Sequence, residues 1–165
     1  MKPAGAPGSS GAALARAQAA VAAGLAGDSW VRTVGRLLAP IPIVSPTGVA
    51  AGWFVPMAVG EQLVGFVQLD SELRYHRYAG FQRQSGQTQG CPLVREWTDP
   101  DAIEARAVSI LGGRVIGTPV LSYDGHPDRI AWRVDVLGAD GRTHVAFVAG
   151  TFVAESRSDE SGRTG

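Results

Sequence analysis

Short apolar runs separated by turn residues occur in the same order in both halves of this chain, and this order strongly constrains its fold. In each half a helical stretch comes first and β-type runs follow. The β-type runs span 41–45, 53–59, 63–69, 115–123, 130–137 and 143–153, and 73–78 could add one further strand. Gly60-Glu61-Gln62 and Ala139-Asp140-Gly141 lie between successive runs and suit hairpin turns. Strands joined by hairpins pair antiparallel, so the sequence predicts an α+β fold with helices packed on antiparallel sheet.

Helix signals precede each set of strands. Residues 12–26 are rich in Ala, with Leu14, Val21 and Leu25 on one face. A second helix is expected from a cap at Asp28 or Ser29 to a stop at Pro40; its apolar residues are Trp30, Val34, Leu37 and Leu38. A third is expected from Asp99-Pro100 to Gly112-Gly113, with a capping side chain before a first-turn proline.

The two halves also share short motifs. PIVSPTG (42–48) resembles PVLSYDG (119–125), and Trp53 and Trp132 begin comparable apolar runs. We therefore expect two pseudo-repeated αβββ units in one compact body, although the similarity could also arise by chance between stretches rich in Val and Gly. The expected divisions are a flexible N-terminus with the Ala-rich helix (1–27), a first unit (28–80), a linker (81–98), a second unit (99–153) and a disordered tail (154–165).

The second half resembles a PepSY domain. The resemblance lies in the helix with its Gly-Gly end, the IAWRVDV run at 130–136, the Ala-Asp-Gly turn and the closing run HVAFVAGTFV at 144–153. It implies a small α+β unit of the kind found in metalloprotease propeptides and bacterial envelope proteins, where such units are proposed to restrain peptidases or bind partners. The chain departs from the family at 150–152, where Gly-Thr-Phe stands in place of an acidic residue and a Gly turn.

Composition argues against several classes of function. The chain of 165 residues has 15 basic and 15 acidic residues, so no net charge favours nucleic acid or an anionic membrane. Its one cysteine, Cys91, excludes an intrachain disulfide and a cysteine-based zinc cluster. No apolar stretch is long enough for a membrane span. These features favour a cytoplasmic protein; export with a poor or trimmed signal in the Ala-rich N-terminus is the alternative.

No residue pattern indicates catalysis. The histidines His76, His126 and His144 are not spaced as metal ligands, and Cys91 lies in a polar linker without an evident base. The Asp residues at turns and helix starts are explained by capping and turn formation. We therefore expect no catalytic residues, no metal and no cofactor.

The most unusual local composition lies at 73–84, where cationic and aromatic residues alternate. Arg74, Tyr75, His76, Arg77 and Tyr78 could bind a partner, or they could form an edge strand whose charges oppose aggregation. On a regular strand Arg74, His76 and Tyr78 would share one face. Trp53 and Trp132 are expected in the core, or else lining an apolar pocket between the two units.

Two functions remain open on these grounds. The first is a non-enzymatic binding or inhibitory module that meets a protein or peptide partner through a sheet surface or an exposed edge. The second is a pocket protein that holds an apolar small molecule between the units, with an enzyme of unrecognised type as one version. The apolar face of the first helix could also form the seam of a homodimer.

Overall fold

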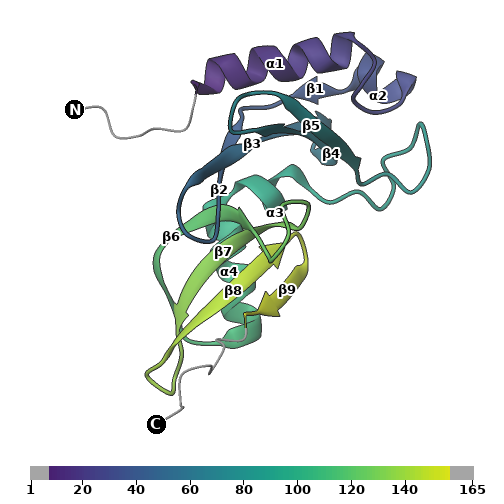
Figure 1. Cartoon of the computed structure of the whole chain (residues 1–165). Coiled ribbons are helices and arrows are strands. Elements are labelled where there is room, and N and C mark those ends of the chain that lie inside the picture. Colours follow the sequence, from purple (N-terminus) through teal and green to yellow (C-terminus); the bar gives the residue numbers. More distant parts are fainter. Residues whose placement is uncertain (1–7, 157–165) are drawn as a thin grey trace.

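The computed structural model describes residues 8–156 of the chain. It contains two antiparallel sheets, one in each half, each with a helix across one face (Figure 1). The elements in chain order are α1 Ser10–Ala22, α2 Ser29–Val34, β1 Arg36–Leu37, β2 Ile41–Val44, β3 Ala50–Val59, β4 Gln62–Asp70, β5 Tyr75–Gly80, α3 Val94–Thr98, α4 Pro100–Leu111, β6 Arg114–Tyr123, β7 Ile130–Leu137, β8 Thr143–Ala149 and β9 Phe152–Glu155. The predicted α+β class is confirmed.

The first sheet, here called sheet A, is a meander of β3, β4 and β5 with β1 and β2 both paired to the outer side of β3. Pro40 lies between β1 and β2, where it cannot donate a ladder hydrogen bond. The second helix is shorter than predicted. It ends at Val34, and Leu37 instead pairs with Met57 in the sheet. The predicted β3–β4 hairpin forms, with Gly60 at φ +60° in its two-residue turn.

Helix α1 lies across sheet A (Figure 1). The Ser9 side chain caps it by accepting a hydrogen bond from Ala12 N at 3.1 Å. Ala13 and Ala17, one helical turn apart, are fully buried against the sheet, since a methyl side chain allows the helix to approach closely. Leu14 and Val21, which on sequence alone could form a homodimer seam, pack at the edge of this same cluster within the chain.

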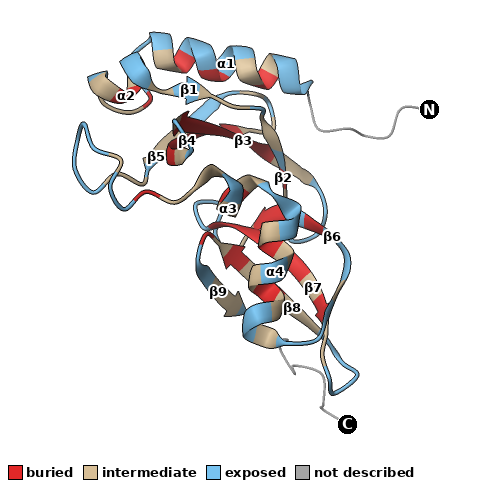
Figure 2. Cartoon of the chain, turned by 180° about the vertical axis from the view of Figure 1, so that it is seen from behind, coloured by how far each residue is buried: buried red, intermediate tan, exposed pale blue. Residues whose placement is uncertain are grey.

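The second sheet, sheet B, is a four-stranded meander in the order β6-β7-β8-β9. Helix α4 covers one of its faces, as seen from behind in Figure 2. The predicted helix start is confirmed, because Asp99 accepts a hydrogen bond from Asp101 N at 3.0 Å and Pro100 occupies the first turn. The run at 143–153 forms two strands rather than one, since Gly150, at φ +62°, turns the chain back.

The largest buried cluster belongs to both halves. It joins residues of sheet A, such as Phe54 and Phe66, to residues of α4 and sheet B, such as Ile103 and Val134. At its centre the Phe54 ring stacks on Phe66, with centroids 4.4 Å apart, and on Trp97 at 5.8 Å. The two halves therefore share one core.

Trp97 belongs to α3, a short helix inside the stretch 81–98 that the sequence predicts as a linker. Its ring packs against the rings of Phe54 and Phe81. Trp132 Nε1 also donates to the Trp97 carbonyl oxygen at 2.8 Å. The stretch therefore carries part of the interface between the halves.

The predicted duplication stays a prediction. Both halves place a helix before an antiparallel meander, but with five and four strands in place of three. The similar motifs occupy different positions: Pro42 pairs with Trp53, whereas Trp132 pairs with Leu121, two residues beyond Pro119. The two heptapeptides therefore occupy different positions in the strand pairing of their sheets.

The chain ends differ in part from expectation. The predicted tail 154–165 begins within β9, which continues to Glu155. Residues 157–165 and the first seven residues, for which the sequence predicts flexibility, lie outside the described residues.

We predict that Phe54→Ala lowers the free energy of unfolding by about 3–5 kcal/mol, because it opens a cavity in a fully buried site. Both halves should unfold together in one transition, because they share this cluster. Urea unfolding followed by tryptophan fluorescence and circular dichroism measures both. Ile110→Ala, at a side chain 61% exposed on α4, is the control. Two separate transitions in the unmodified chain would contradict the shared core.

Candidate binding surfaces

The predicted binding segment 74–78 lies on β5 and the turn before it, and a β-bulge determines where its side chains point. Arg77 pairs with Gln68 and Tyr75 pairs with Leu69, so His76 is an extra residue in the ladder. The bulge interrupts the alternation of side chains. The expectation that Arg74, His76 and Tyr78 share one face is therefore wrong.

The two tyrosines of this segment turn toward the helical layer of the first half. Tyr75 Oη donates to the Leu25 carbonyl at 2.9 Å. Tyr78 packs beneath α1, and burial raises the pKa of its hydroxyl to about 12. Arg74 pairs instead with Asp70 at 3.0 Å and Glu72 at 3.1 Å.

His76 and Arg77 reach the other half of the molecule. His76 Nε2 lies 2.8 Å from Asp128 Oδ1, in the turn between β6 and β7, and Arg77 Nη2 donates to the Asp128 carbonyl at 2.8 Å. Buried Gln68 accepts from Arg77 Nε at 2.8 Å and donates to the Pro127 carbonyl at 3.2 Å. These contacts form a polar joint between sheet A and the β6–β7 turn. Much of the predicted binding segment is thus engaged within the chain.

The two tryptophans of the predicted pocket are apart. Trp53 belongs to the cluster under α1, and Trp132 belongs to the core shared by both halves. Both are nearly buried, at 6% and 7% exposure. They do not face one another across a gap. Both pack in buried clusters, as the alternative of a place in the core predicts.

The face of sheet B opposite α4 leaves several large apolar side chains exposed. Along β7, Trp132 and Val134 face the core, so alternation directs Arg133 and Asp135 outward. Their neighbours in the sheet register complete what we call the open face: Ile116, Val120, Arg133, Asp135, Val145, Phe147 and Phe152. Figure 1 views the molecule with this face toward the reader and α4 behind it.

Three large apolar side chains of the open face are exposed to solvent. Ile116 is 40% exposed, Val120 41% and Phe152 66%. Arg133 and Asp135 lie between them and form an ion pair at 3.5 Å. No sequence pattern brings these residues together, since they come from three strands; register alone makes them neighbours.

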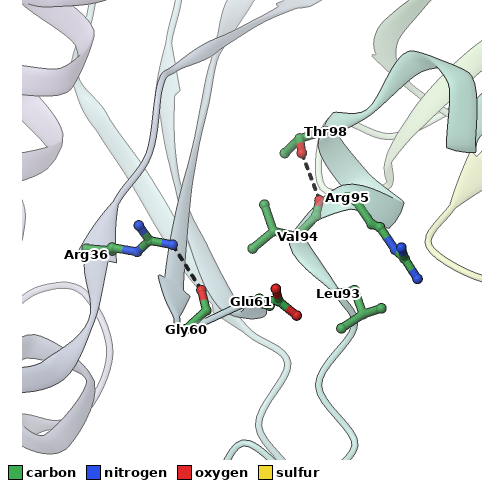
Figure 3. Close-up of a pocket in the computed structure, with 7 residues that line it drawn as sticks. All are labelled: Arg36, Gly60, Glu61, Leu93, Val94, Arg95 and Thr98. Atoms are coloured by element: carbon green, nitrogen blue, oxygen red, sulfur yellow. Dashed lines mark hydrogen bonds between the residues drawn. The ribbon is translucent and has the colours of Figure 1, made fainter.

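A hollow of about 350 Å³ lies between the β3–β4 hairpin and α3 (Figure 3). Val94 N donates to the Glu61 carbonyl at 2.9 Å, which joins the two walls. Arg36 is held by its bond to the Gly60 carbonyl at 3.0 Å, and the Glu61 side chain lies between it and Leu93. Arg95 carries a second positive charge at the rim. The hollow is thus partly apolar and edged by charge.

Within residues 8–156, His, Cys, Asp and Glu side chains form no group of three or more that could hold a metal ion. Cys91 is buried beside Val31 and Met57, and this burial raises the pKa of its thiol. Over the same residues, no helix is long and apolar enough to cross a membrane.

Comparison of the chain with protein-family models, with curated proteins and with solved structures finds no match in any of the three. The resemblance to PepSY domains and the site residues expected from the sequence therefore stay predictions.

We predict that the joint at Asp128 weakens in acid. The hydrogen bond from His76, with the charge of Arg77, holds the pKa of Asp128 below its ordinary value of 3.8. Because the folded-state pKa lies below the unfolded one, this carboxylate stabilises the fold above pH 3.8 and loses its effect as pH falls through the folded value.

Asp128→Asn should therefore lower the Tm at neutral pH. The gap in Tm between this variant and the unmodified chain should close in acid. Calorimetry across this pH range measures the gap. Asp124→Asn is the matched control, because Asp124 lies in the same turn and forms no ion pair within the described residues. A gap independent of pH would show that Asp128 acts through packing alone.

Proposed function

We propose that this chain is a non-enzymatic binding module that recognises a protein or peptide partner through the open face of sheet B. The observation that carries the proposal is the exposure of Ile116, Val120 and Phe152 around a central ion pair. Folded chains generally keep contiguous apolar surface away from water, and patches that stay exposed commonly serve as interfaces.

The composition of the open face suits recognition rather than chemistry. Apolar side chains supply the free energy of association, and a charged pair among them restricts which partners fit. Its two charged residues, Arg133 and Asp135, are paired with one another. The resemblance to PepSY domains supports the same reading, because those units are proposed to bind partners or restrain peptidases.

The adjoining edge strand offers a second element of recognition. β9 pairs with β8 on one side only, and Phe152 begins it. In an antiparallel ladder alternate residues direct their backbone groups away from the partner strand. An extended peptide could therefore pair with this edge while its side chains extend the open face.

The test is selection of peptides from a random displayed library on the full-length chain. We expect enriched peptides with alternating apolar residues, since such peptides fit a sheet surface. Val120→Asp should weaken binding of a selected peptide at least about tenfold, or roughly 1.4 kcal/mol, because it places a charge in the apolar contact.

The matched control is Ile110→Asp, which adds the same charge at an exposed apolar side chain of α4. This variant should bind the selected peptide as the unmodified chain does. Failure to enrich any peptide, or equal binding to Val120→Asp, would count against the open face as the partner site.

A second candidate is a small-molecule site in the hollow beside α3, which lies between the first unit and the stretch 81–98 rather than between the two units. Its lining also departs from the pocket predicted from the sequence, because Arg36 and Arg95 favour an anionic group over a purely apolar ligand. Leu93 and Val94 supply the apolar surface for the rest of such a ligand (Figure 3).

For this candidate we predict that aliphatic and aromatic carboxylates shift the amide NMR signals of Gly60, Glu61 and Val94. Arg95→Gln should weaken the binding, because it removes one of the two cations at the rim. Arg142→Gln, at the β7–β8 turn, is the charge-matched control. Unchanged signals with a varied set of carboxylates would exclude this ligand class from the hollow.

A further inference from the structure

The charges and apolar groups of the open face follow two rows across sheet B. One row consists of Val120, Arg133 and Phe147 on β6, β7 and β8. The next row consists of Ile116, Asp135 and Val145; it lies two residues along β7 and β8, and four residues along β6, where the register shifts between Ile116 and Val120. Each row therefore has an apolar side chain, a charge and a second apolar side chain, and the two charges are opposite in sign.

We propose that the open face binds a second copy of this chain, in a symmetric dimer with the two sheets packed face to face. This inference rests on the proposed function, because it names the protein partner of the same surface. A two-fold interface uses one patch on both subunits, so the patch must be complementary to itself.

The rows meet that requirement. Consider a two-fold axis in the plane of the interface, at right angles to β7 and crossing it between Arg133 and Asp135. Rotation about this axis reverses the direction along the strands but keeps the position across the sheet. The first row of one copy therefore lies over the second row of the other.

Each side chain then meets a suitable counterpart. Arg133 faces Asp135 of the second copy, and Asp135 faces Arg133. Val120 faces Ile116, while Phe147 faces Val145, so apolar groups meet apolar groups on both sides of the charges. Opposite charges brought together across an interface fix its register, and they disfavour an arrangement that brings like charges together.

The 45–49 turn limits how a second copy can be oriented on this face. The 45–49 turn of the first half reaches the first row of the open face, where the Pro46 carbonyl accepts from Arg133 Nη1 at 3.4 Å. In the dimer this turn lies toward the opposite end of the partner sheet, beside the β7–β8 hairpin. If the strands of the two sheets ran in the same direction, the turns of both copies would meet at one end. With the strands in opposite directions, the two turns lie at opposite ends.

The size of the face predicts a weak dimer. Four strands of four to ten residues cover a footprint of roughly 450 Å², from standard strand spacing and rise. Stable interfaces bury about 800 Å² on each partner, so this contact is near the lower limit for specific association. We therefore expect dissociation in the micromolar concentration range, with exchange between monomer and dimer.

The test is sedimentation equilibrium of the full-length chain over a range of concentrations. The mass should rise from one chain toward two as concentration increases. Arg133→Asp creates a face with two acidic groups, and Asp135→Arg creates a face with two basic groups. Each variant alone should dissociate at least about tenfold more readily, because like charges meet across the axis.

Mixing the two variants separates the dimer from any effect within one chain. The acidic face of Arg133→Asp should pair with the basic face of Asp135→Arg, so the mixture should recover the association that each variant lacks. Loss of the internal Arg133–Asp135 pair cannot explain such recovery, since both variants lack it. Ile110→Asp should associate as the unmodified chain does, and circular dichroism checks that each variant folds.

Three results would overturn the inference: a mass of one chain at all concentrations, a dimer that neither charge variant weakens, or a mixture that stays monomeric. None of these would decide the proposed function, which peptide selection tests separately. If the chain stays monomeric but selected peptides bind and Val120→Asp weakens them, the open face takes a different partner. If the chain dimerises and selected peptides also bind the open face, a selected peptide should compete with the second copy of the chain.

Discussion

The stacking of Phe54 on Trp97 holds the two halves of this chain in one body. Phe54 comes from the first sheet, and Trp97 comes from the short helix between the halves. The Trp97 carbonyl also accepts the indole proton of Trp132 from the second sheet. Each half alone is one sheet with one main helix, which buries little apolar surface for its length. The shared core therefore supplies burial that neither half has by itself.

This arrangement decides which surfaces remain for other molecules. One face of sheet A is covered by α1 and the other contributes to the shared core, so its strands have little free surface. The charges of His76 and Arg77 are engaged at Asp128 in the polar joint. Sheet B differs, because only its face against α4 contributes to the shared core. Its outer side chains stay in contact with solvent, and this asymmetry is the basis of both the proposed function and the proposed dimer.

The candidate site was only partly accessible to sequence reasoning. Tyr75, His76 and Arg77 do make contacts between distant parts of the chain, which agrees with their unusual composition, but the contacts described are internal. The open face was missed because its members are single residues of ordinary strands. Val120 and Phe147 stand 27 positions apart, and only their common pairing with Arg133 makes them neighbours. A one-residue change of register would send each to the other side of the sheet.

The sequence by itself determined the elements whose signals are local: the cap at Asp99-Pro100, the alternating strand at 130–137 and the Asp140-Gly141 turn. These signals work because capping, proline geometry and hairpin turns depend on a few adjacent residues. Only the tertiary structure decided the conformation of α3, the bulge at His76 and the pairing of Leu37 with Met57 in the sheet. Each of these depends on partners far along the chain, and long-range pairing overrides weak local preference. The open face belongs with them, because it exists only once four strands have paired.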